Sequence, residues 1–255
     1  MKKLSGVFIC LLLFTVLSSA RIIEVADAGI TDKLRAVIAA KNAPAGESYP
    51  GFDYDVYEDF EDALAGSWSE TDVSTVLDPN NSDAEYVGTY GMKYDSATTA
   101  EAYANYTLGA GSANLSVGFW FKSGTYAGWA GDSWILVIYN DTNGSALVVR
   151  EGNSAGDDSR RLSWGTDADV ITIADATWYY LTCEYVQNGT SQCNLYNTSL
   201  AKVGSTMSGA SNDWIAEDVR ICGYSVASST ACFYDEVFID TTDATFPLGP
   251  PVGTP

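Results

Sequence analysis

The 255-residue sequence predicts an all-β protein built as a sandwich of two antiparallel sheets. Three observations support this fold class. From about residue 51, apolar residues recur with a period of two, which is typical of half-buried strands. Turn sequences such as Asn143-Gly144 and Asn188-Gly189 separate these strands. No comparable helical period appears after residue 65, and many short strands with frequent turns indicate a sandwich or a barrel.

The first twenty residues have the pattern of a secretory signal peptide. Lys2 and Lys3 form the positive end, residues 7–17 form a short apolar segment, and Ser18-Ser19-Ala20 supplies small residues for cleavage. The apolar segment is shorter than the roughly 18 to 20 residues that span a bilayer. We therefore expect residues 1–20 to be removed, which leaves no membrane span. The mature protein is expected to be secreted, or to lie on a cell or virion surface.

Residues 21–50 follow a different pattern. The apolar residues Ile30, Leu34, Val37 and Ile38 recur at helical spacing, and Thr31 is a suitable N-cap residue. The segment APAGESYPG, with two prolines and two glycines, then interrupts the helix. We expect a short amphipathic helix and a linker, with the helix docked on the following domain or on a partner.

The alternating strands begin after this linker. The segment NLSVGFWFK has one apolar face, made of Leu115, Val117, Phe119 and Phe121. The segment WYYLTCEYV likewise places on one side Tyr179, Leu181, Cys183 and Tyr185. The segments SWILVIYN and ALVVR are nearly continuous apolar runs, as expected of central strands. We place the domain at residues 51–248, followed by an extended proline-rich tail at 249–255.

The cysteines indicate disulfides rather than a metal site. Four cysteines remain after the signal peptide, namely Cys183, Cys193, Cys222 and Cys232. An even number in an exported chain favours disulfides, and no CxxC pair or histidine is present to complete a zinc site. Four cysteines allow three connectivities. We favour two local bridges, 183–193 and 222–232, because each pair lies across a predicted hairpin turn.

Charge and composition exclude several functions. The formal net charge is −20, so the surface repels nucleic acid and anionic lipid. The sequence contains no histidine, which excludes Ser-His-Asp and Cys-His catalysis and any metal site that needs imidazole. Neutral or cationic partners are favoured.

Several motifs occur in an order that resembles a known family. They are YEDFEDALAGSWSE, then YGMKYDSATTAEAYANYTL, LSVGFWFK and TWYYLTCEY, and finally FYDEVFID followed by FPLGP. Over residues 56–248 this order resembles the concanavalin A-like lectin/glucanase superfamily, most closely its laminin G-like domains. The resemblance implies a jelly roll of two antiparallel sheets, one of them concave. It also implies glycan binding or adhesion as the commonest roles.

The closing segment ACFYDEVFID, residues 231–240, raises the question of whether its acids are catalytic. Strict alternation places Asp235 on one face with Val237 and Ile239, opposite Glu236. Retaining glycosidases need two carboxyl groups about 5 Å apart, and the glucanases of the resembled superfamily carry them as Glu-x-Asp-x-x-Glu on one strand. This segment lacks that motif. We expect a structural strand.

Exposed aromatic residues are the first candidates for ligand binding, because sugars stack on aromatic rings. Tyr126 and Trp129 lie among glycines in GTYAGWAGDSW, where burial is hard to arrange. Trp120 lies opposite the apolar face of its strand and either faces a groove or is covered by a loop. Trp164, close to two arginines, is a weaker candidate.

Acidic loops raise the possibility of a bound calcium ion. The loops NDTNGS and GNSAGDD supply the oxygen-bearing side chains Asp141, Asn143, Asp157 and Asp158. Members of the resembled superfamily often hold calcium near the rim. Neither loop matches a complete calcium-binding motif, so solvated turns are the alternative.

Seven Asn-x-Ser/Thr sequons occur, at Asn80, Asn105, Asn114, Asn140, Asn143, Asn188 and Asn197. This exceeds the roughly two expected by chance from the composition and is compatible with glycosylation. Sequons that arise from Asn-Gly turns and Ser/Thr-rich strands, and that stay unmodified, are the alternative.

These observations predict a secreted, non-enzymatic domain that binds a neutral or cation-associated glycan or polysaccharide, or acts in adhesion. Two alternatives stay open. One is a structural surface, coat or virion decoration protein, whose partners are neighbouring surface proteins. The other is a polysaccharide hydrolase or lyase of the same fold. The missing acid motif and missing histidine argue against the enzyme, although lyase chemistry by tyrosine and arginine is not excluded.

Overall fold

The computed structural model describes part of the chain, namely residues 55–61, 64, 66–72, 77–95, 102–124, 132–152, 161–164, 170–222 and 231–241. The chain divides into two compact units, one of residues 1–42 with 251–253 and one of residues 43–250 with 254–255. All described residues belong to the second unit. The predicted signal peptide, helix, linker and tail lie outside the described residues.

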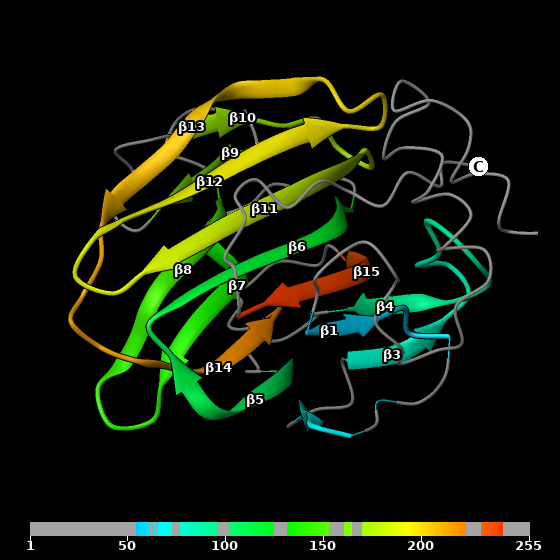
Figure 1. The fold of residues 1–255 in the computed structure, drawn as a ribbon. Coiled ribbons are helices and arrows are strands. Elements are labelled where there is room, and N and C mark those ends of the chain that lie inside the picture. The colour runs from blue at the N-terminus through cyan, green and yellow to red at the C-terminus, as the bar shows by residue number, and fades with distance from the viewer. Residues whose placement is uncertain are drawn as a thin grey trace, which may run out of the picture. The chain divides into compact units, whose positions relative to one another are not determined.

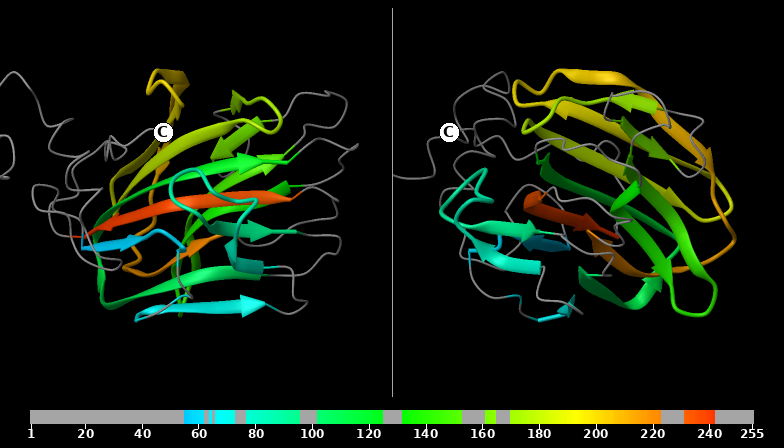
Figure 2. Two further views of the ribbon diagram at one scale, coloured as in Figure 1. Left: turned by 90° about the vertical axis from the view of Figure 1, so that its right-hand side faces the viewer. Right: turned by 180° about the vertical axis from the view of Figure 1, so that it is seen from behind.

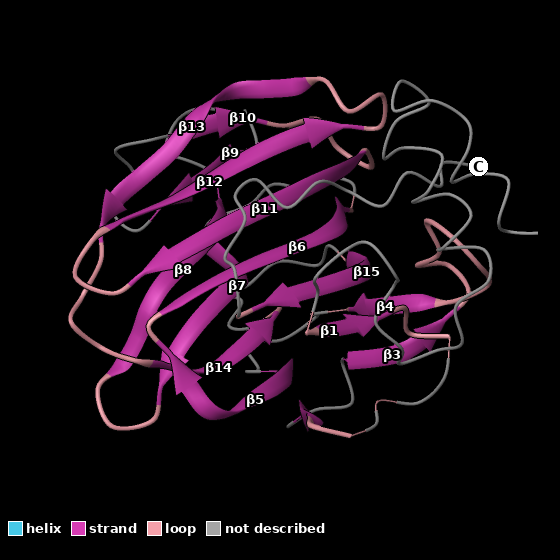
Figure 3. Cartoon of the chain, in the orientation of Figure 1, coloured by secondary structure: helices cyan, strands magenta, loops and turns pink. Residues whose placement is uncertain are grey.

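The described residues form strands and no helix, as the sequence predicts (Figure 3). Eight strands make one sheet, here called sheet A: β1 (Val56–Glu58), β3 (Leu77–Asn81), β4 (Gly91–Tyr94), β6 (Asn114–Ser123), β11 (Trp178–Val186), β12 (Thr190–Asn197), β13 (Lys202–Ala210) and β15 (Cys232–Asp240). Within the described part of the chain, no helix is long and apolar enough to cross a membrane.

Seven strands make the second sheet, sheet B: β2 (Trp68–Asp72), β5 (Ala102–Ser112), β7 (Asp132–Asn140), β8 (Gly144–Gly152), β9 (Arg161–Trp164), β10 (Val170–Thr172) and β14 (Ala216–Ile221). Neighbouring strands are antiparallel, in the order β13-β12-β11-β6-β15-β4-β3 in sheet A and β10-β9-β8-β7-β14-β5-β2 in sheet B. Sheet A crosses the front of Figure 1, with β7, β8 and β14 of sheet B behind it, and Figure 2 shows the same strands from the side and from behind.

The core lies between the inward faces of the two sheets. The predicted apolar faces of β6 and β11 are both part of it, since Val117, Phe119 and Leu181 are fully buried there. Sheet B contributes inward side chains such as Leu136 and Val219. The period-two pattern therefore predicted correctly which faces of these strands are buried.

The first predicted disulfide is present. Cys183 and Cys193 lie directly opposite each other on β11 and β12, and their sulfur atoms are bonded. The hairpin turns at Asn188, with a φ of 57°, which is the left-handed conformation that asparagine tolerates. The Gly189 N–H donates to the Val186 carbonyl and closes the turn.

The second predicted disulfide is not formed in the structure. Cys222 follows β14 in sheet B, whereas Cys232 begins β15 in sheet A, so the two residues are not neighbours in a hairpin. Both are buried thiols, and the Cys232 sulfhydryl donates to the Glu151 carboxylate at 3.7 Å. The prediction was wrong because it assumed that consecutive strands pair, while this connection crosses from one sheet to the other.

Strict alternation also failed at the closing strand. The pairing of β15 with β6 shifts between Asp235 and Phe238, and Glu236 has a φ of 53°. This β-bulge inserts an extra residue, so that Asp235 lies opposite Trp120 on the outer face while Val237 and Ile239 enter the core. The expected grouping of Asp235 with Val237 and Ile239 is therefore wrong.

Candidate functional site

The candidate Trp120 is buried and does not line an open groove. Its exposed fraction is 1%, and its ring stacks on Tyr86 at a centroid distance of 4.0 Å. The Asp235 carboxylate holds the segment that carries Tyr86, because it accepts the N–H groups of Tyr86 and Val87 at 2.7 and 2.9 Å. Trp120 is thus covered by a loop, which was the alternative to an exposed groove residue.

The acids of the closing strand have structural contacts. Burial raises the pKa of Asp235 to about 9, and the charge of Glu236 acts in the same direction. Three backbone N–H groups donate to the Asp235 carboxylate, and these hydrogen bonds lower its pKa. Burial raises the pKa of Glu236 to about 7, and its carboxylate accepts the Tyr57 hydroxyl at 2.8 Å. Both side chains point into packed protein, which favours the structural interpretation of this strand.

Several other candidate residues are not described. Tyr126, Trp129, Asp157 and Asp158 lie outside the described residues. Trp164 ends β9 in sheet B, and its side chain is also outside the description.

Asp141 and Asn143 occupy the turn between β7 and β8, but they point to different partners. The Asn143 side-chain amide donates to Asn140 at 2.8 Å, whereas the Asp141 main-chain N–H donates to Glu217 on β14 at 2.7 Å. Among the described residues, no three or more cysteine, aspartate or glutamate side chains are grouped to hold a metal ion. Calcium binding stays a prediction that involves the undescribed loop.

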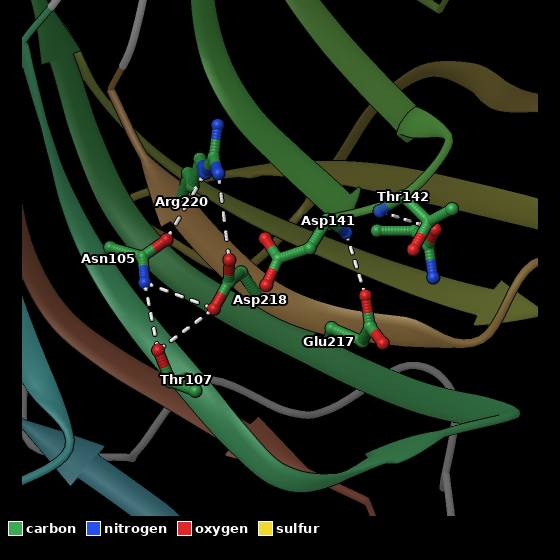
Figure 4. Close-up of polar contacts among 8 residues, drawn as sticks. Asn105, Thr107, Asp141, Thr142, Glu217, Asp218 and Arg220 are labelled. Carbon is green, nitrogen blue, oxygen red and sulfur yellow. Dashed lines mark hydrogen bonds and ion pairs between the residues drawn. The ribbon is translucent and has the colours of Figure 1, made fainter.

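A polar network occupies the outer face of sheet B. On β14, Asp218 and Arg220 alternate with the core residues Val219 and Ile221. Asp218 is paired with Thr107 of β5, and Arg220 is paired with Asn105 of the same strand. Because directly opposite residues of an antiparallel pair share a face, the four polar side chains lie together (Figure 4).

Short contacts join this network. The Asn105 side-chain amide and the Thr107 hydroxyl both donate to Asp218 Oδ1, at 3.1 and 2.9 Å. Arg220 Nε donates to Asn105 Oδ1 at 3.2 Å, and Arg220 Nη2 lies 3.6 Å from Asp218 Oδ2. Although only 8% of Asn105 and 6% of Asp218 are exposed, their polar atoms are satisfied by one another.

Two tyrosines enclose the guanidinium of Arg220. Its Cζ lies 3.5 Å from the ring centroid of Tyr139 on β7 and 4.7 Å from that of Tyr103 on β5. Both tyrosines are half-buried. A guanidinium so close to two ring faces is held by cation–π attraction. The result is a rigid strip of two rings with a charged group between them.

Asp141 adds a carboxyl group at the edge of this network. It is exposed and lies next to Asp218 in Figure 4. The negative charge of Asp218 is the main cause that raises the pKa of Asp141, and desolvation and the charge of Glu217 act in the same direction. Arg220 acts in the opposite direction. The edge of the network therefore has an excess of negative charge.

Comparison with known proteins identifies the fold. The sequence matches no protein-family model and no curated protein sequence. Among solved structures, the cellulose-induced protein Cip1 superposes with a TM-score of 0.51 at 14% identity, over 74% of this chain and 98% of that chain. The CBM2 module of the evolved Dit protein of Lactobacillus casei BL23 phage J-1 gives 0.52 at 12%, over 75% and 97%. An endo-β-1,4-glucuronan lyase from the fungus Trichoderma reesei gives 0.51 at 13%, over 74% and 96%.

These superpositions and the two antiparallel sheets decide the fold class. The chain has the concanavalin A-like fold. The jelly-roll architecture expected from the motif order is confirmed.

The main residues of the network were not recognised in the sequence of this concanavalin A-like domain. We did not predict a functional role for Arg220, Asp218, Tyr103 or Tyr139. Asn105 was identified only as a sequon. One signal was available, since the DVRI part of β14 alternates charged and apolar residues and so indicates a polar outer face. No pattern within a single strand shows that β5, β7 and β14 are neighbours in the sheet.

The structure separates the sequons by their contacts. Asn105 and Asn140 are buried, and their side-chain amides donate to Asp218 and to the Ile215 carbonyl, respectively. Asn114 is exposed, and so are Asn80 and Asn143. Asn188 is exposed as well, and Asn197 is half-buried. Glycosylation stays a prediction, and it is compatible with the folded protein chiefly where the asparagine is exposed.

Proposed function

We propose that the outer face of sheet B binds a glycan at the strip formed by Tyr103, Arg220 and Tyr139. The observation that carries this proposal is the guanidinium fixed between two half-buried rings, beside the hydrogen-bonded Asn105 and Asp218. Aromatic rings accept the apolar face of a sugar, and carboxylates, amides and hydroxyls fix its hydroxyl groups. Both kinds of group are preorganised here by the sheet.

The fold supports the same class of function. The solved structures that superpose on this chain include a CBM2 module and a lyase that acts on glucuronan. At these identities the similarity concerns the fold alone, so the location of the site rests on the contacts of Arg220 and not on those proteins.

We further propose that the protein is secreted or displayed on a surface. The first twenty residues support this by their signal-peptide pattern. The Cys183–Cys193 disulfide supports it as well, because disulfides persist mainly in oxidising compartments.

Hydrolysis is less well supported than binding. The buried pair Asp235 and Glu236 contacts the backbone and Tyr57, and these contacts occupy it within packed protein.

The test is binding of residues 21–255 to a panel of soluble polysaccharides by titration calorimetry. We expect Tyr139→Ala and Arg220→Ala to weaken binding by about tenfold or more, which corresponds to the loss of one aromatic or cation–π contact. Trp129→Ala tests the undescribed loop as the competing location.

Two matched variants serve as controls, Tyr196→Ala and Lys93→Ala on sheet A. They remove the same kinds of side chain from the other sheet and are expected to leave affinity unchanged. If the panel gives no saturable binding, the glycan proposal is wrong and the structural surface role becomes the leading explanation. If binding survives in Tyr139→Ala and Arg220→Ala but is lost in Trp129→Ala, the strip is not the site and the competing location is favoured.

A further inference from the structure

The charge balance of the strip bears on which glycans it accepts. Arg220 supplies one positive charge, which is paired with Asp218. The Asp141 carboxyl group lies next to Asp218, and Glu217 lies beyond it, where it accepts the Asp141 main-chain N–H (Figure 4). The guanidinium of Arg220 already makes two kinds of contact. It forms an ion pair with Asp218, and it is enclosed by the rings of Tyr103 and Tyr139.

An incoming carboxylate or sulfate would meet a guanidinium that is already ion-paired to Asp218 and enclosed by two rings. The donors of Asn105 and Thr107 are also occupied, since both donate to Asp218. The exposed Asp141 carboxylate adds acceptor oxygens at this edge of the strip. Sugar hydroxyls and ammonium groups donate to such acceptors, whereas a sugar carboxylate would be repelled by them.

Asp141 is the residue of this group with the most exposed position. Its main-chain N–H is fixed to Glu217, while its carboxyl group stays close to Asp218. Repulsion by the Asp218 charge is the main cause of the raised pKa of Asp141. A negative charge on a ligand would add to this repulsion. The backbone contact does not depend on the Asp141 side chain, so the charge can be removed without removing that contact.

From this geometry we propose that Asp141 is a specificity-determining residue that makes the strip reject anionic sugars and accept neutral sugars and amino sugars. This inference rests on the proposed glycan site and adds its charge selectivity. It assigns to Asp141 a role in discrimination and assigns the main affinity to Tyr139 and Arg220.

The experiment compares charge forms of the same backbone. Soluble β-1,4-glucan, galactan and mannan oligomers are each titrated as the neutral form and as the form oxidised at C6 to the uronate, and the β-1,4-glucosamine oligomer is added as the cationic form. For each backbone that binds, we expect the uronate to bind about tenfold more weakly than the neutral form or worse, and glucosamine to bind at least as well as the neutral glucan.

The variants make the inference specific to Asp141. Asp141→Asn and Glu217→Gln are expected to reduce the ratio of neutral to uronate affinity several-fold, because each removes one negative charge from the edge of the strip. Asp175→Asn removes an equal charge from an exposed turn whose Ala176 N–H donates to the Ser123 carbonyl, at the end of β6 in sheet A. This variant is expected to leave the ratio unchanged.

The outcomes separate the two proposals. Binding of the neutral oligomer with equal or tighter binding of its uronate overturns the charge inference and leaves the glycan site intact. An unchanged ratio in Asp141→Asn overturns the role of that residue. Absence of binding by every oligomer overturns the proposed function, and the charge inference with it.

Discussion

Asp235 shows how one side chain connects two parts of the fold. Its carboxylate lies in the bulge of β15 and accepts backbone N–H groups from Tyr86 and Val87, so it anchors the segment that covers Trp120. A buried carboxyl group is costly unless its acceptors are satisfied. The protein satisfies this one with three N–H donors, the third being that of Glu236. The same burial makes the folded state sensitive to pH.

The raised pKa values set the direction of this sensitivity. The pKa of Asp235 rises from 3.8 to about 9 and that of Glu236 from 4.5 to about 7, so the folded state keeps protons that the unfolded state releases. The free energy of unfolding is therefore expected to fall as the pH rises from about 4 to about 9. Urea denaturation at pH 5, 7 and 9 measures it. Asp235→Asn should flatten the fall between pH 7 and 9, and Asp83→Asn, at an exposed site, should not. A rise of stability across this window would contradict the assignment.

At the scale of elements, the β11–β12 hairpin is reinforced more than its neighbours. The Asn188-Gly189 turn sets its register, and the Cys183–Cys193 disulfide links the two strands at directly opposite positions. β11 also pairs with β6, whose inward side chains form much of the core. The hairpin therefore holds β12 and the edge strand β13 to the centre of sheet A.

Removal of this disulfide should lower stability. The bridge closes a loop with a sequence separation of 10, and we expect Cys183→Ala/Cys193→Ala to lose about 2 to 3 kcal/mol of unfolding free energy. Guanidinium denaturation with and without reductant measures the loss. The double variant should also become insensitive to reductant. If the parent protein has the same midpoint in reductant, the bridge does not contribute as described.

At the scale of the whole molecule, the charge of −20 shapes both partners and stability. Like charges repel one another in the compact state, and added salt screens this repulsion. We expect the free energy of unfolding at pH 7 to increase by on the order of 1 kcal/mol between 0.05 and 0.5 M sodium chloride. The effect should disappear near pH 4.1, where the chain has no net charge. An equal salt effect at both pH values would point to a cause other than charge.

The sequence predicted those features that depend on neighbouring residues. The alternation around Val117 and Phe119 predicted the buried face of β6, and the turn at Asn188 predicted the disulfide. Features that depend on distant segments were missed. Trp120 is covered by Tyr86, and Arg220 is enclosed by tyrosines from two other strands. Such contacts follow from the strand order, which no local pattern contains.

The position of Asn105 has a consequence for how the protein is best produced. Its side-chain nitrogen, which is the atom that oligosaccharyltransferase modifies, donates to both Asp218 and Thr107. A glycan attached there would take the place of the network beside Arg220. Recombinant material from yeast or mammalian cells would thus risk carrying its own sugar in the proposed site, whereas export to the bacterial periplasm would form the disulfide and leave this asparagine bare.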